Sequence, residues 1–144
     1  MQQNIERIIL TNLCHNEEYL RKVIPFLKPE YFSSSSERVI FNKIASHTDA
    51  YNAAPSKQAI VIAVTEDKSV SETQYNEVQT IVNEMEQEDT NGQWLLDETE
   101  KFCKDKALFN AIMESIQIID GKNKELGKDA LPSILSDALG VGFD

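Results

Sequence analysis

Glycine and proline are scarce in this sequence, at 5 and 4 of 144 residues. Because these two residue types form many tight turns and end many helices, their scarcity favours long helices over numerous short strands. No apolar run approaches the roughly 18 residues that a membrane-spanning helix needs. The first 20 residues carry charged side chains where a secretory signal would be apolar. We therefore expect an all-α protein of the cytoplasm that does not associate with membranes.

The common motifs of catalytic and metal sites are also missing. There is no GxxxxGK[ST] phosphate-binding loop, no GxSxG and no HExxH. Cys14 and Cys103 lie far apart in apolar surroundings, and together with His15 and His47 they give no recurring zinc spacing. We expect no catalytic residue, metal or cofactor in this chain, and two cysteines that are buried in a reducing compartment.

The charge is strongly one-sided, with a formal net value of −10. Since DNA affinity comes largely from Lys and Arg, we expect little direct DNA binding by this chain. No basic residue occurs from 84 to 100, so this acidic tract is either a solvated pair of helix ends or a docking face for a basic partner. The candidate docking residues are Glu84, Glu86, Glu88, Asp97, Glu98 and Glu100.

Apolar residues recur at helical spacing along the whole chain. This spacing predicts helices over 4–13, 16–28, 71–85, 92–119 and 131–139, with Pro25 ending or bending the second. Segment 57–64 is rich in β-branched residues and could be a strand. A lone strand would have no partner, so we interpret it as a short buried helix that Ser56 caps.

Four consecutive serines, Ser33 to Ser36, resemble a linker at first sight. However, Ser34 followed by Glu37 fits a capping box, in which each side chain bonds the other residue's backbone N–H. The run therefore predicts a helix start, with Tyr31 and Phe32 packed against the new helix.

The long helix and the return helix form the expected hairpin. At about 1.5 Å per residue, a helix over 92–119 measures about 42 Å, whereas a bundle of about 90 residues is about 30 Å across. We expect the hairpin to project and to pair with another copy or a partner, rather than to bend and pack within one bundle. The expected interface residues are Leu95, Phe102, Phe109, Ile112, Ile116, Ile119, Ile134, Leu135 and Leu139.

Two stretches carry a family resemblance. "EEYLRKVIPFLKPEYF" and, after four residues, "ERVIFNKI" resemble the amino-terminal domain of DnaB-type replicative DNA helicases, most closely those of T-even-type bacteriophages. "AAPSKQAI", "WLLDETEKF", "ALFNA", "LPSIL" and "ALGVGFD" extend the resemblance over almost the whole chain. The matching residues are Leu27, Pro29, Glu30, Phe32, Arg38, Ile40 and Phe41.

The resemblance implies a helical bundle over 1–90, then over 91–144 a hairpin and the start of a linker to an absent motor domain. Hairpins of this family pair as dimers and build a collar on a hexameric ring that docks primase, and a helicase loader is a further candidate partner. ATP and Mg²⁺ belong to the motor domain, so the implied role is structural, in an infected bacterial cell. Two alternatives stay open: a helicase-binding domain of a primase, and a small acidic phage adaptor or inhibitor.

Overall fold

The computed structural model describes residues 4–143, and every regular element within them is a helix, which confirms the all-α prediction. None of these helices is long and apolar enough to cross a membrane. The elements, in chain order, are α1 (Ile5–His15), α2 (Glu17–Val23), η1 (Ile24–Phe26), η2 (Pro29–Tyr31), α3 (Ser35–Tyr51), α4 (Lys57–Glu66), α5 (Glu72–Glu84), α6 (Gly92–Ile119), η3 (Lys128–Ala130) and α7 (Leu131–Leu139).

Side-chain caps set where the helices begin. The side chains of Asn4, Ser34 and Ser56 each accept a hydrogen bond from the backbone N–H three residues later, which satisfies a donor that the first turn leaves free. Ser71 and Gln74 form a complete capping box. These caps agree with the starts expected from the sequence.

Two further expectations about local structure are confirmed. Segment 57–64 lies within helix α4, and its Ile60 is fully buried. Helix α2 ends at Val23, and Pro25 lies in the short helix η1 that follows. Proline removes a backbone donor and clashes with the preceding turn, so the α-helix cannot continue through it.

The serine run begins helix α3 and is not a linker. Of the two hydrogen bonds expected for its capping box, the structure has one and lacks the other. Ser34 caps the helix, but the Glu37 carboxylate does not return to the Ser34 backbone. Instead, the Glu37 carboxylate accepts hydrogen bonds from the Ser34 hydroxyl at 3.0 Å and from Arg7 Nε at 3.1 Å. Glu37 is buried, and a buried carboxylate is more stable beside a guanidinium than beside a backbone amide alone.

Aromatic rings join the first half of α6 to the bundle formed by α1 to α5. The ring of Phe102 lies 5.6 Å from that of Phe32 and 6.3 Å from that of Tyr31, measured between centroids. Phe32 in turn stacks on Phe41 at 5.1 Å. We call these four residues the aromatic joint. Leu95, Phe102 and Cys103 belong to the same core cluster as the apolar residues of α1 to α5.

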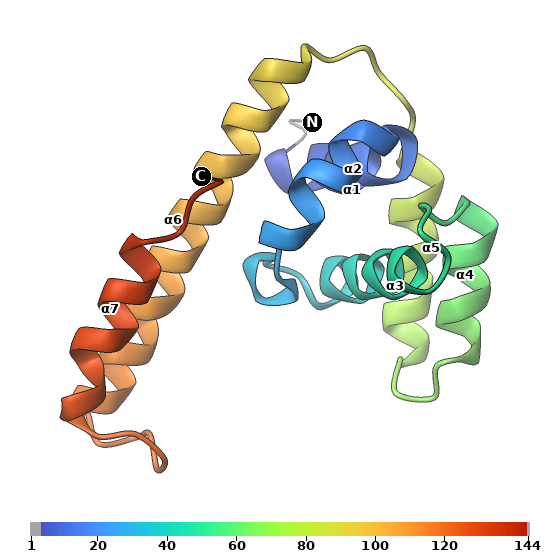
Figure 1. The fold of residues 1–144 in the computed structure, drawn as a ribbon. Coiled ribbons are helices and arrows are strands. Elements are labelled where there is room, and N and C mark those ends of the chain that lie inside the picture. Colours follow the sequence, from blue (N-terminus) through green and yellow to red (C-terminus); the bar gives the residue numbers. More distant parts are fainter. Residues whose placement is uncertain (1–3, 144) are drawn as a thin grey trace.

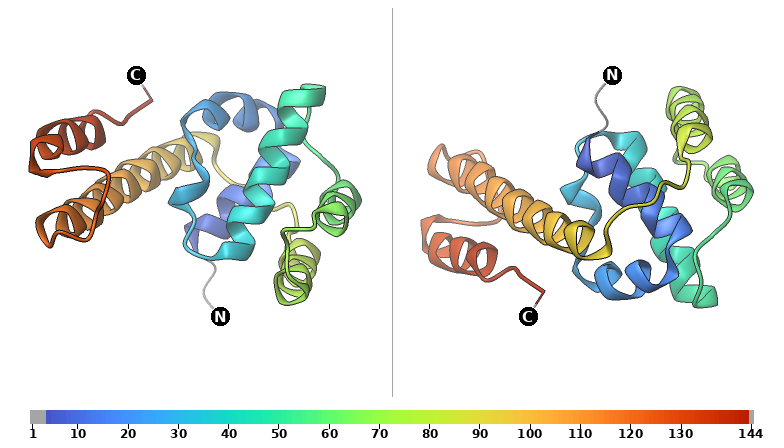
Figure 2. Two further views of the ribbon diagram at one scale, coloured as in Figure 1. Left: turned by 90° about the horizontal axis from the view of Figure 1, so that it is seen from below. Right: turned by 90° about the horizontal axis from the view of Figure 1, so that it is seen from above.

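The second half of α6 extends beyond the bundle with α7 beside it, as Figures 1 and 2 show. Gly121, at φ 75°, ends the long helix in the left-handed conformation that glycine adopts without strain. The backbone N–H groups of Gly121 and Lys122 bond the carbonyls of Ile118 and Gln117. The chain then returns through η3 into α7, so the hairpin has the expected long and short arms, while the division at residue 90 stays a prediction.

Two phenylalanines one heptad apart on α6 give a matched test of this arrangement. Phe102 is 5% exposed and Phe109 is 58% exposed. Phe102→Ala should lower the free energy of unfolding by about 3–5 kcal/mol, because it opens a cavity in the core. Phe109→Ala should change it by about 0.5 kcal/mol or less. Urea denaturation of the dilute chain measures both values, and equal losses would contradict the packing described.

Candidate partner interface

The second half of α6 carries an exposed apolar stripe. Its members are spaced three and four residues apart, so they share one face of the helix. Their exposed fractions run from 44% to 58%, which is unusual for side chains of this size in a single chain. The apolar stripe consists of Phe109, Ile112, Met113, Ile116 and Ile119.

Helix α7 covers a different face of α6 and leaves the apolar stripe open. Ala111, Ser115 and Ile118 are the buried residues on this half of α6. Small side chains at Ala111 and Ser115 allow two helices to approach closely. On α7, Ile134 and Leu135 are half-buried, whereas Leu139 is 73% exposed.

The structure therefore divides the interface residues expected from the sequence. Phe109, Ile112, Ile116, Ile119 and Leu139 are exposed. Including Leu95 and Phe102 in this surface was wrong, because they are 1% and 5% exposed within the core of the bundle. Sequence analysis also missed Met113, although its position four residues after Phe109 on the same helix could have identified it.

The acidic tract does not form one uniform face. Glu86 and Glu88, in the segment after α5, line a hollow of about 180 Å³ together with Ile8 of α1 and Trp94 of α6. Trp94 is the single tryptophan of the chain and is 45% exposed. This hollow thus combines carboxylates with an aromatic ring, a pair of features that favours a cationic side chain.

The other expected docking residues have partners within the chain or lie elsewhere. Glu84 is 3.7 Å from Arg7 Nη1, and Glu100 accepts a hydrogen bond from the backbone N–H of Phe143 at 2.9 Å. Asp97 accepts from the Gln93 side chain, one turn earlier on α6. Glu98 is half-buried on α6. Of the six candidate docking residues, Glu86 and Glu88 line the hollow beside Trp94.

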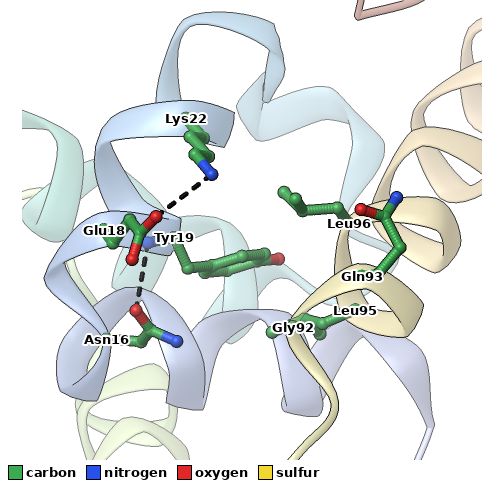
Figure 3. Close-up of a pocket in the computed structure, with 8 residues that line it drawn as sticks. All are labelled: Asn16, Glu18, Tyr19, Lys22, Gly92, Gln93, Leu95 and Leu96. Atoms are coloured by element: carbon green, nitrogen blue, oxygen red, sulfur yellow. Dashed lines mark hydrogen bonds and ion pairs between the residues drawn. The ribbon is translucent and has the colours of Figure 1, made fainter.

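A second hollow, of about 240 Å³, lies between α2 and the start of α6 (Figure 3). Tyr19 forms its wall, and Lys22 and Glu18 form an ion pair of 3.2 Å at its edge. Because Thr99 Oγ1 donates to the Leu95 carbonyl, the Tyr19 hydroxyl must be the donor in its own 2.7 Å bond to Thr99. Burial raises the pKa of Tyr19 above its usual value, so this hydroxyl stays protonated and joins α2 to α6.

The cysteines and histidines occupy separate packing positions. Burial raises the pKa of the Cys14 and Cys103 thiols to about 12, so a thiolate nucleophile is scarcely populated near neutral pH. His15 Nδ1 donates to the Thr11 carbonyl at 2.8 Å, and the His47 ring lies against Tyr51. Across residues 4–143, no group of three or more His, Cys, Asp and Glu residues could hold a metal ion.

Taken together, residues 4–143 form an all-α chain in which a helical bundle is followed by a projecting hairpin with an open apolar stripe. No protein-family model matches the chain. It is 34% identical over 145 residues to the DnaB-like replicative helicase of Enterobacteria phage T4, in an alignment that covers 95% of this chain. The chain is therefore a homologue of a DnaB-like replicative helicase, and it spans about 30% of the length of that relative.

Proposed function

We propose that this chain is the amino-terminal collar domain of a DnaB-type replicative helicase. In this role it associates with other copies of itself, as dimer pairs within a hexameric ring, and docks primase during DNA replication. Homology along almost its entire length to part of one such helicase supports this role over that of a primase domain or an acidic inhibitor. ATP and Mg²⁺ would act in the motor portion of the helicase, outside this chain.

The observation that carries the self-association is the apolar stripe on α6. Five large side chains in one row, each about half exposed, would gain free energy by leaving water. Their exposed area is on the order of 400 Å² per copy, about half of what each partner buries in a standard stable interface. We therefore expect two hairpins to pair weakly when the domain is isolated, and more firmly when a ring holds many copies together.

Sedimentation of the chain over a range of concentrations tests this pairing. Phe109→Asp should weaken self-association about tenfold or more, because pairing would bury an uncompensated carboxylate. Ile62→Asp is the matched control, since Ile62 is 56% exposed on α4 of the bundle. Its substitution adds the same charge and should leave self-association unchanged. A strictly monomeric parent chain up to millimolar concentration, or equal effects of both substitutions, would contradict the pairing.

We propose that primase docks at the hollow beside Trp94, which is lined by two residues of the acidic tract, Glu86 and Glu88. Its carboxylates at Glu86 and Glu88 are exposed, so they attract a basic surface over about 8–10 Å at moderate salt. Trp94 borders the same hollow, and a cation over its ring would add to the binding free energy. A helicase loader is a further candidate for this surface.

Titration of the cognate primase, followed by Trp94 fluorescence and calorimetry, tests the docking surface. The double substitution Glu86→Lys and Glu88→Lys should weaken binding about tenfold or more at low salt, because it reverses the charge that meets the basic partner. Asp49→Lys with Glu66→Lys makes the same change in net charge on exposed positions of α3 and α4. Equal binding by both double variants would show that primase docks elsewhere on the domain.

A further inference from the structure

The last described residues turn back toward the bundle after α7 ends. Figure 1 shows this segment running along α6, away from the far end of the hairpin. The ring of Phe143 stacks on that of Phe26 in η1, with centroids 4.7 Å apart and planes at 28°. The backbone N–H of Phe143 donates to Glu100 Oε2 at 2.9 Å. The segment over 140–143 thus contacts both the bundle and the long helix.

Although the segment 140–143 is not helical, its contacts are directional and partly buried. The hydrogen bond to Glu100 is charge-assisted, which makes it stronger than one between neutral groups. Val141 and Phe143 are half-buried and pack against the core cluster. An extended segment loses conformational entropy when it is held in place, so the ring stacking and the hydrogen bond must offset this loss.

The tail segment holds α6 on a different side from the aromatic joint. Glu100 and Phe102 are two residues apart, so they point about 200° apart around the helix. Phe102 faces Tyr31 and Phe32, whereas Glu100 faces the tail. The first half of α6 is therefore contacted by the aromatic joint on one side and by the segment 140–143 on another.

We propose that residues 140–143 act as a latch that fixes the angle between the hairpin and the bundle. With Phe143 stacked on Phe26, the end of α7 is tied to η1, and the hairpin cannot swing away from the bundle. When the latch opens, the contact through Phe143 is lost, α6 is held only by its own contacts with the bundle, and the hairpin samples a wider range of angles. Gly140 and Gly142 flank Val141 and give the backbone the freedom to open and close the latch. This latch does not depend on the proposed self-association.

Hydrogen exchange and spin-label distances test the latch in the full chain at monomeric concentration. In the parent chain, the Phe143 amide should be protected from exchange. Phe143→Ala removes the ring stacking, so the amide of residue 143 should exchange about tenfold faster. Spin labels on Lys68→Cys and Lys124→Cys report the distance between the α4–α5 loop and the tip of the hairpin. Their distance distribution should broaden in Phe143→Ala and also in Glu100→Ala, which removes the acceptor instead.

Tyr51→Ala is the matched control, because it removes an exposed aromatic ring from the surface of α3. It should leave both the exchange rate at residue 143 and the distance distribution as they are in the parent chain. The latch is refuted if the Phe143 amide of the parent exchanges at the rate of an unstructured peptide. It is also refuted if the distribution stays equally narrow in Phe143→Ala and Glu100→Ala.

Discussion

The contact of Phe102 with Tyr31 and Phe32 determines how the two parts of this molecule are arranged. It places the first half of α6 in the core of the bundle. Since an α-helix is stiff over this length, the packing of its first half sets the mean direction of its second half, and the proposed latch narrows the range around that direction. The apolar stripe is exposed because neither the bundle nor α7 covers its face of α6.

The serine run supports this joint with polar contacts. Glu6 accepts hydrogen bonds from the backbone N–H and the hydroxyl of Ser33, which ties α1 to the segment before α3. Lys106 of α6 donates to the same hydroxyl at 3.0 Å, and Asn110 donates to the Glu30 carbonyl at 3.2 Å. The serine run, which resembles a linker in the sequence, thus contributes to the surface against which the long helix packs.

The sequence predicts this fold where local chemistry decides it. Caps such as Ser34 and Ser71 depend on neighbours three residues away, and the spacing of apolar residues fixes the helices. Local spacing does not reveal which side chains meet across the fold. Leu95, Phe102, Phe109 and Ile116 share one seven-residue repeat, yet the structure buries the first two and exposes the last two. The stacking of Phe143 on Phe26 joins residues that lie far apart in the sequence, and no local pattern predicts it.

Native-state hydrogen exchange along α6 in the dilute chain tests most directly whether the aromatic joint divides this helix. The amides around Phe102 should exchange only through global unfolding, because their side of the helix belongs to the core. The amides around Ile116 should exchange through a smaller opening, with protection about tenfold or more below that near Phe102. Uniform protection along α6, or weaker protection near Phe102 than near Ile116, would contradict this division.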